Sequence, residues 1–422
     1  MKDKLTDANF PRTADNRVYH LGLRPGEIAN KIITVGSPSR ALTIAAHLDE
    51  EPKKFRIESE RGFQTITGRY KGTPVSVISI GMGAPNMDFF VREARESITG
   101  DMVIIRLGSC GSLTHTSAPV GTVVVPKACV GITRNVDFDF GRPEDEQMNE
   151  ERAYRISKPV SDDPQLHQIV VKSLENARPV GDQTVVAGHL VNASADSFYS
   201  SQGRLTSFPD HNTHLVEELL QQVDDLGTLE METHHLYHLA KCWNHRPKIS
   251  SSRSNNLNHT APPLTTGPVR PVTLDSSPSR VNLGSPSASA PLVTVDSKIY
   301  VSAAQMVFAA RTSVERDFIT PERVQAIEEW GGKGVLEALI AYVIPAERLH
   351  PEKGSTQIVH QARSVVYLCS FWAIRFFVVC PRSRRHLLKA LSVLRILRWK
   401  LAGFHSRSMN RCFPNKHFWM TE

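Results

Sequence analysis

Two carboxylates and three histidines stand close together in the segment LEMETHHLYH, residues 229–238. Glu232 and His235 are three residues apart, and His234 and His238 are four apart, so on a helix each pair would share a face. A metal site built on this segment would need further ligands from elsewhere in the chain. The sequence offers no convincing second cluster, so we expect no metal, and we expect the histidines to be surface or core residues of a helix.

Three glycine-rich segments carry the other residues that could do chemistry: GSPSR at 36–40, GMGAPN at 81–86 and RLGSCG at 106–111. Glycine lets a backbone approach an anion closely, and a helix amino terminus supplies aligned N–H donors. Arginine adds planar, bidentate donation to phosphate. A single glycine after a strand is more often only a turn, and none of the segments matches a P-loop or a G-x-G-x-x-G fingerprint. Together they indicate an anion site.

The elements that would position these segments alternate between strands and helices over residues 20–240. Apolar runs predict strands at 30–36, 101–113 and 121–130 and a hairpin leading into a strand at 68–83. Helical patterns cover 38–48, 86–98 and 163–177, with Pro38 near a helix start. Strands that end in glycine-rich segments before helices predict an α/β sheet with its site at the carboxyl ends of the strands.

The chain then divides by composition. We expect an amino-terminal arm at 1–18, a first part of the domain at 19–243, a disordered insertion at 244–298, a second part at 299–355 and a basic, partly apolar tail at 356–422. The insertion is dense in Ser, Pro, Asn and Thr and has no aromatic residue, so it cannot bury enough surface to fold. The second part predicts a strand at 298–313 and a helix at 319–344, with Pro321 at its start.

The formal net charge of +7 comes from the tail, which holds twelve Lys or Arg and one acid. The body is mildly acidic, so nucleic acid is not an expected partner. The tail is either a membrane-surface anchor, or a reading-frame extension or helix that packs on the body; we favour the second. The six cysteines are scattered without a CxxC pair, and no apolar run of signal-peptide length begins the chain, so we expect a reducing, cytoplasmic location.

Several motifs in order resemble the uridine phosphorylases of the class I nucleoside phosphorylase superfamily. They are YHLGL (19–23), VGSPSR (35–40), SERGFQT (59–65), GMGAPN (81–86), IIRLGSCG (104–111), SADSFYSSQGR (194–204) and LEMET (229–233), and the match resumes from about Ile299 to Pro345. The resemblance spans roughly 270 of the 422 residues and is interrupted by the Ser/Pro-rich segment. It implies an α/β fold with a central mixed, twisted, partly barrel-like sheet flanked by helices.

The resemblance assigns a phosphate site to Gly36, Arg40, Arg106 and Ser109. It implies that Arg61 reaches phosphate in the site of a neighbouring subunit. His20 would cross the same interface to the ribose 5′-hydroxyl. The expected assembly is therefore a homo-oligomer with shared sites, at least a dimer, and relatives occur as dimers and hexamers. Gly62 stands where bacterial relatives have a glutamate that helps to bind a monovalent cation, so no such site is expected.

The same resemblance assigns the nucleoside site. Gln202 and Arg204 would read the uracil ring, Phe198 would form an aromatic wall, and Arg311 would lie near the base. Uracil offers two acceptors around one donor, which suits an amide that both accepts and donates and an arginine that donates. The ribose contacts would be Met231 and Glu232, with Glu230 beside them, and the methionine gives a soft apolar contact.

The implied reaction is reversible phosphorolysis of uridine to uracil and ribose 1-phosphate, a step of pyrimidine salvage. Inorganic phosphate is the co-substrate, no other cofactor is expected, and Arg106, Arg204 and Arg311 would stabilise developing charge. The stretch AARTS at 309–313 lacks the aspartate of purine-specific relatives, which favours a pyrimidine. The alternatives are a nucleosidase, a different base specificity, or a membrane-tethered homologue that binds nucleosides without catalysis.

Overall fold

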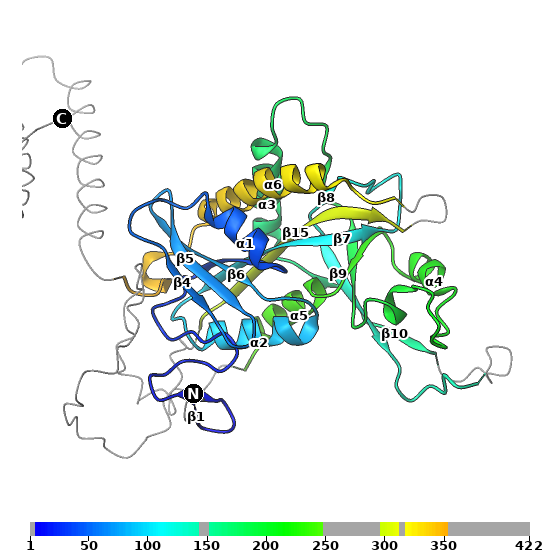
Figure 1. Cartoon of the computed structure of the whole chain (residues 1–422), viewed down its shortest axis with the longest axis horizontal. Coiled ribbons are helices and arrows are strands. Elements are labelled where there is room, and N and C mark those ends of the chain that lie inside the picture. The colour runs from blue at the N-terminus through cyan, green and yellow to red at the C-terminus, as the bar shows by residue number, and fades with distance from the viewer. Residues whose placement is uncertain (1–4, 143–151, 248–295, 312–316, 353–422) are drawn as a thin grey trace, which may run out of the picture. The chain divides into compact units, whose positions relative to one another are not determined.

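The computed structural model describes residues 5–142, 152–247, 296–311 and 317–352 (Figure 1). The expected tail at 356–422 and almost all of the expected insertion at 244–298 lie outside the described residues. No helix within the described ranges is long and apolar enough to cross a membrane.

A thirteen-stranded mixed sheet forms the centre of the fold (Figure 1). Its main path runs β10-β9-β13-β14-β7-β3-β6-β5-β4, and β8, β11, β12 and β15 pair off this path. The strands are β3 (Lys31–Val35), β4 (Phe55–Glu58), β5 (Gln64–Tyr70), β6 (Thr73–Ser79), β7 (Met102–Ser112), β8 (Val123–Val124), β9 (Ala128–Arg134), β10 (Tyr154–Ile156), β11 (Val160–Ser161), β12 (Val186–Ala187), β13 (Val191–Ala195), β14 (Leu226–Glu230) and β15 (Ile299–Ala310). Upstream, β1 (Leu5–Thr6) and β2 (Arg12–Thr13) form a separate antiparallel pair.

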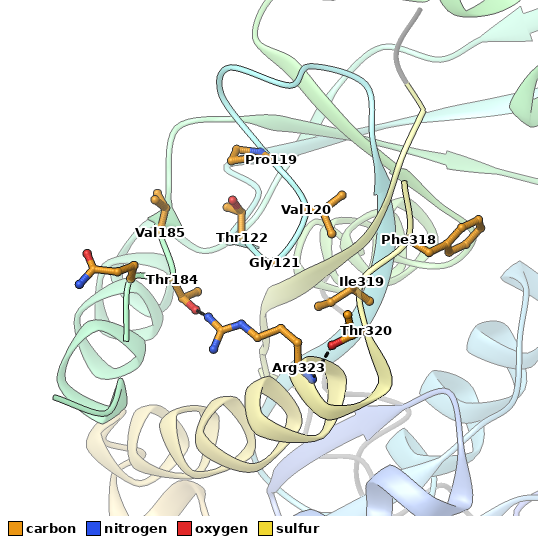
Figure 2. Close-up of a pocket in the computed structure, with 11 residues that line it drawn as sticks. Pro119, Val120, Gly121, Thr122, Thr184, Val185, Phe318, Ile319, Thr320 and Arg323 are labelled. Atoms are coloured by element: carbon orange, nitrogen blue, oxygen red, sulfur yellow. Dashed lines mark hydrogen bonds between the residues drawn. The ribbon is translucent and has the colours of Figure 1, made fainter. Parts of the chain in front are cut away.

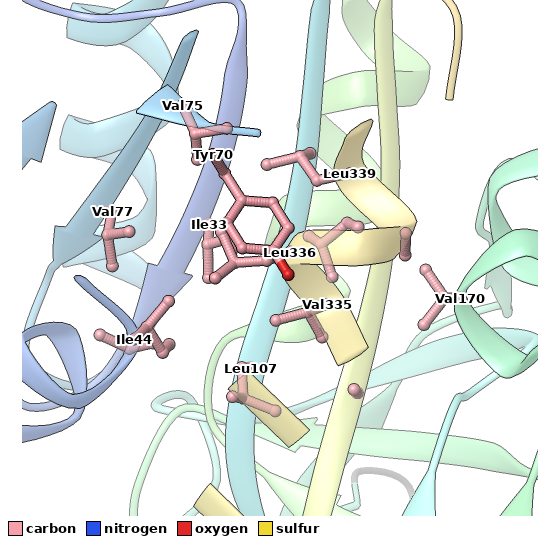
Figure 3. Packing of buried hydrophobic residues seen from close by; sticks show 14 of the residues in the cluster. Ile33, Ile44, Tyr70, Val75, Val77, Leu107, Val170, Val335, Leu336 and Leu339 are labelled. Atoms are coloured by element: carbon pink, nitrogen blue, oxygen red, sulfur yellow. The ribbon is translucent and has the colours of Figure 1, made fainter. Parts of the chain in front are cut away.

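Helices cover both faces of this sheet (Figure 1). They are α1 (Pro38–Ala45), α2 (Ala84–Arg95), α3 (Pro164–Ala177), α4 (Leu215–Gln222), α5 (Thr233–Asn244) and α6 (Pro321–Ala341), with short 3-10 turns η2 (Ser200–Gln202) and η4 (Ala346–Arg348). One core cluster joins α1, α3 and α6 to the sheet and includes Ile44, Val170 and Leu336 of these helices together with Ile33 of β3 (Figure 3). A second cluster buries Phe90 of α2 and Tyr237 of α5 on the other face. This mixed sheet between helix layers confirms the expected fold class.

Local capping explains where three of the helices begin. Ser37, Asp163 and Thr320 each accept a hydrogen bond from the backbone N–H three residues later, and each is followed by a proline at the first helical position. A short oxygen-bearing side chain satisfies an unpaired N–H there, and proline has no N–H to lose. The predicted helices at 38–48, 86–98, 163–177 and 319–344 are confirmed, with small differences at their ends.

The predicted continuous strand at 121–130 is wrong. Val123 and Val124 form β8, which pairs with β12 and β15, and β9 begins only at Ala128 and pairs with β13. Pro126 lies between the two pieces and has no N–H for a ladder hydrogen bond. The chain changes partners at this proline.

The strand predicted at 101–113 is confirmed as β7, but the glycines of RLGSCG belong to this strand, which continues to Ser112, and do not form a loop at its end. They are strand residues that pair in parallel with β15 along its length, with Ile299 beside Met102 and Ala310 beside Ser112. A Cβ atom at Gly108 would stand 2.4 Å from Gln305 Oε1, and one at Gly111 would stand 3.1 Å from Arg311 Cδ. These glycines therefore make room for Gln305 of β15 and for Arg311, which directly follows β15.

Candidate active site

Arg106 lies at the centre of a buried polar cluster. It sits on β7 between Thr34 of β3 and Ala303 of β15, and only 3% of its surface is exposed. Its Nη2 donates to Glu232, and its Nε lies 3.6 Å from Glu230 Oε2. Among the described residues its Nη1 has no hydrogen-bond partner. A buried guanidinium with an unused donor can bind an anion.

Glu230, at the end of β14, is surrounded by protein donors. One oxygen accepts from Asn192 at 2.8 Å and from Ser194, and the other accepts from the Thr233 hydroxyl and from the backbone N–H of Glu232, both at 2.9 Å. Burial by itself raises the pKa of Glu230, but Arg106 and these hydrogen bonds outweigh burial and lower its pKa. Glu230 is thus held as a carboxylate that orients the start of α5.

Glu232 has fewer partners. Its Oε1 accepts from the backbone N–H of Gly83 and its Oε2 accepts from Arg106. Burial raises the pKa of Glu232, Arg106 opposes this, and the charge of Glu230 adds to it. Since each carboxylate oxygen can accept more than one hydrogen bond, Glu232 keeps acceptor capacity for two neighbouring hydroxyl groups.

Arg40 brings a second guanidinium to the same end of the sheet. It is 7% exposed, and its Nη1 donates to Leu107 O of β7 at 3.4 Å. Its Nε donates to Glu328 Oε1 of α6 at 2.8 Å. Burial lowers the pKa of Arg40, Glu328 opposes this shift, and the charge of Arg106 adds to it, so the two guanidiniums interact. The structure therefore groups Arg40 and Arg106 with Glu232.

Two more of the predicted phosphate residues lie on or directly after the neighbouring strands β3 and β7. Gly36 directly follows β3 and joins the GMGAPN segment, because its carbonyl oxygen accepts from Gly81 N at 3.1 Å. Ser109 is half-buried on β7, three residues after Arg106. Cys110 next to it is buried, and burial raises the pKa of its thiol well above the ordinary value, so it stays protonated.

The predicted base-binding residues form a second group. Arg204 donates from Nη1 to the Gln202 side chain and to Phe198 O, and its guanidinium lies 3.8 Å from the centre of the Phe198 ring. Gln202 is buried, whereas Phe198 is 46% exposed. Burial lowers the pKa of Arg311 to about 10, and the charge of Arg204 adds to the shift, so these two arginines are neighbours.

The remaining predicted nucleoside residue on this side is Met231. It is half-buried between β14 and α5, directly between the two glutamates in sequence. The junction of β14 and α5 therefore presents Met231 and Glu232 together.

His20 and Arg61 lie in a different cluster. His20 stacks on Phe89 with ring centres 3.8 Å apart, and its Nδ1 lies 2.7 Å from Glu93 Oε1. Arg61 is exposed and donates to the Tyr19 hydroxyl. Within the described part of one chain, no hydrogen bond or ion pair joins His20 or Arg61 to Arg106 or Glu232.

The three histidines after LEMET have different polar partners, although the rings of His234 and His238 stack with their centres 6.0 Å apart. His234 lies against Gly131, and burial lowers its pKa to about 4. His235 Nε2 lies 3.2 Å from Asp88, and His238 Nε2 lies 3.5 Å from the Cys242 sulfur. The described residues contain no group of three or more His, Cys, Asp or Glu side chains that could hold a metal ion.

Two open cavities lie outside these clusters. One, of about 380 Å³, is lined by Thr122, Thr184, Phe318 and Arg323 among others (Figure 2). Arg323 is already bound by Asp182 through two hydrogen bonds of 2.7 and 2.8 Å. The other, of about 400 Å³, lies beside η2 and is lined by Tyr199 and Ser200 among others. Neither cavity is lined by a predicted site residue.

Sequence reasoning missed several residues that hold the site together. The backbone N–H of Gly83 binds Glu232, Glu93 binds His20, and Glu328 binds Arg40. The GMGAPN segment was a visible signal for the first of these. Glu328 gives no such signal, because an acid on a helix is usually an ordinary solvated residue.

Comparison with known proteins defines the class to which this fold and site belong. A sequence model of the phosphorylase superfamily matches residues 30–264. A uridine phosphorylase of Thermococcus kodakarensis is 30% identical over 247 residues, which are 58% of this chain and 79% of that protein. A DeoD-type purine nucleoside phosphorylase of Oceanobacillus iheyensis is 32% identical over 223 residues, 52% of this chain and 80% of that protein.

Solved structures agree. One from a study of uridine phosphorylases of the oomycete Phytophthora capsici aligns with a TM-score of 0.62 and 34% identity, covering 81% of this chain and all of that one. A Trypanosoma brucei nucleoside phosphorylase aligns with a TM-score of 0.55 at 21% identity, which shows the shared fold. The chain belongs to the phosphorylase superfamily. It is an enzyme of the nucleoside phosphorylase type, as the motifs predicted.

Proposed function

We propose that this enzyme catalyses the reversible phosphorolysis of uridine, giving uracil and ribose 1-phosphate. The carrying observation is the buried group of Arg40, Arg106 and Glu232. Two guanidiniums with unused donor capacity lie beside a carboxylate with unused acceptor capacity. Phosphate would bind the arginines, and Glu232 would accept from the 2′- and 3′-hydroxyls of the ribose.

In this proposal the protein positions its reactants and needs no covalent nucleophile. Phosphate lies below C1′ and attacks as the glycosidic bond breaks through an oxocarbenium-like state. Arg204 and Arg311 stabilise the negative charge that develops on the departing uracil. Since Arg311 has a buried Nη1 without a partner among the described residues, it can donate to a base carbonyl.

Uridine is proposed over a purine nucleoside on two grounds. Gln202 and Arg204 provide an amide and a guanidinium for a ring with two carbonyls. The described residues of β15 and Arg311 contain no acid that could protonate a purine ring. Relatives of both specificities match the chain, so the assay must include both kinds of substrate.

The test measures loss of uridine, thymidine, deoxyuridine and inosine with and without inorganic phosphate. We expect phosphate-dependent cleavage of uridine by the full chain and a fall in kcat/KM of at least about a hundredfold in Arg106→Ala. Arg155→Ala is the control, because Arg155 is exposed and its one ion pair within the described ranges is with the exposed Asp137. Cleavage without phosphate would indicate a nucleosidase, preference for inosine a purine enzyme, and uridine binding without turnover a non-catalytic homologue.

We also propose that His20 and Arg61 complete the site of a neighbouring subunit. In one chain they lie on a surface cluster that is not connected to Arg106 by any described hydrogen bond or ion pair, although the motifs assign them to the same site. No cofactor other than phosphate is needed for this reaction.

A further inference from the structure

A residue of α6 restricts the orientation of the Arg40 guanidinium at the proposed anion site. Its Nε donates to Glu328 Oε1 at 2.8 Å, and its Nη1 donates to Leu107 O at 3.4 Å. These contacts fix the plane of the guanidinium at two of its three nitrogens. The described structure shows no hydrogen bond from its Nη2, which is therefore available to a ligand.

The partner that fixes this plane is itself held by the core. Glu328 belongs to the second turn of α6 and is followed two residues later by the buried Trp330. The Glu328 side chain is 18% exposed and the Arg40 side chain 8%. At this depth an ion pair with good geometry holds its members more firmly than an exposed pair does.

An ordering contact is needed because the two arginines repel one another. The charge of Arg106 contributes to the lowered pKa of Arg40, and Glu328 opposes that shift. Without an acceptor on Nε, a long arginine side chain regains rotamer freedom and can turn away from a second cation. The acceptor on Nε keeps the Nη edge aimed at β7, where Arg106 lies.

We propose that Glu328 is a positioning residue that orients Arg40 for phosphate, a role that rests on the proposed function of this site. It acts through the Arg40 Nε–H and does not touch phosphate. The feature required of residue 328 is an acceptor at the correct reach, and its negative charge is secondary. If the Glu328 carboxylate acted only through its charge, by shielding Arg40 or by competing with phosphate, the response would be reversed. Removing the charge would then change the affinity for phosphate, and moving the acceptor would matter less.

Three substitutions separate these roles on the full chain. Glu328→Gln keeps an acceptor oxygen at the same reach and removes the charge. Glu328→Asp keeps the charge and withdraws the acceptor by one methylene, and Glu328→Ala removes both. Glu329→Gln is the matched control, because Glu329 is the next residue of α6, is exposed, and makes no described hydrogen bond or ion pair.

The readouts are the dissociation constant for inorganic phosphate from calorimetry and the KM values for phosphate and uridine. We expect Glu328→Ala and Glu328→Asp to weaken phosphate binding about tenfold, with the KM for uridine and the melting temperature nearly unchanged. Glu328→Gln and Glu329→Gln should stay within about twofold of the wild type. If Glu328→Ala does not fold, the contrast between Asp and Gln decides the question.

The proposal is overturned if Glu328→Gln weakens phosphate binding as much as Glu328→Asp, or if removing the carboxylate tightens it. It is also overturned if all the variants bind phosphate as the wild type does. A wild type that binds phosphate but does not cleave uridine refutes the proposed function alone, because the binding comparison still reports on Arg40. Phosphate binding that is absent from the wild type refutes both.

Discussion

Glu230 and Glu232 are two residues apart in LEMET and have different surroundings in the fold. Glu230 accepts hydrogen bonds from Asn192, Ser194 and Thr233, whereas among the described residues the Glu232 carboxylate accepts hydrogen bonds only from Gly83 and Arg106. The sequence predicts that both acids lie at the site but does not say which has acceptor capacity left. That difference depends on β13 and on the turn after β6, which are far away in the chain. This difference supports the proposal, made first from the resemblance, that Glu232 contacts the ribose and that Glu230 lies beside it as a support.

Lys31 is a single residue whose titration should be visible in the stability of the whole protein. It is 7% exposed, its Nζ donates to Tyr342 O at 2.7 Å and to Ile340 O at 3.3 Å, and burial lowers its pKa to about 8. Between that value and the ordinary value near 10.5, the unfolded chain binds more protons than the folded chain. The contribution of Lys31 to the free energy of unfolding therefore rises with pH across this window.

This prediction is checked by urea denaturation of the wild type and of Lys31→Met from pH 7 to pH 10.5. The stability of the wild type relative to the variant should be constant up to about pH 8 and increase above it. Lys333→Met, at an exposed position of α6, should show no such change. A difference between wild type and Lys31→Met that stays flat or shrinks above pH 8 would contradict the argument.

At the scale of the element, α6 carries a pair of neighbouring glycines that lie in different environments. A Cβ atom at Gly332 would stand 2.9 Å from Ile44 Cγ1 of α1, whereas one at Gly331 would meet nothing within 4 Å. Gly332→Ala should lower the free energy of unfolding by about 1–2 kcal/mol, because overpacking exceeds the gain in helix propensity. Gly331→Ala should raise it by up to about 1 kcal/mol. Denaturation curves for the two variants give the test. Equal free energies of unfolding would show that Ile44 of α1 moves aside for the added methyl group without loss of stability.

The elements could be predicted where a local rule decides them. Pro38 and Pro321 mark helix starts because each follows a capping side chain, and the segment KIITV at 31–35, rich in β-branched residues, marks a strand buried on both faces. Local rules fail to predict the bounds of a strand where its pairing with other strands decides them. The strand at 121–130 divides at Pro126 because its halves have different partners, and β7 extends through Gly108 and Gly111 because β15 pairs with it there.

At the scale of the whole molecule, the site should be complete only in an oligomer. Arg61→Ala and Arg106→Ala would each be inactive alone, because each removes one residue from every shared site. Mixing the two variants under conditions that exchange subunits should restore activity, to about a quarter of the wild-type value for a dimer, since half of the dimers are mixed and each mixed dimer has one intact site. Activity and subunit exchange are measured on the same mixture, and exchange without recovered activity would contradict a shared site.

The sequence predicts the residues of the site that local motifs mark, and it does not predict those whose role depends on contacts between distant segments. Glycine-rich strand ends, arginines and LEMET mark the residues that the fold groups around Arg106. GMGAPN marked Gly83, but its contact with Glu232 and the role of Glu328 lay beyond prediction, because they depend on packing between segments 149 and 288 residues apart. The surface position of His20 and Arg61 in a single chain follows from the fold, and the motifs alone do not place them there.

The pairing of β15 with β7 has a consequence for how this protein is made. A ribosome releases β7, the arginine segments and LEMET long before Ile299 emerges, so the nascent polypeptide carries the long edge of β7 without its parallel neighbour. An open edge of this length invites pairing with other chains, and joining segments so distant in sequence is slow. Completion of the sheet thus waits until β15 has left the ribosome, and a product that terminated before residue 299 would retain Arg40, Arg106 and Glu232 without the strand beside them.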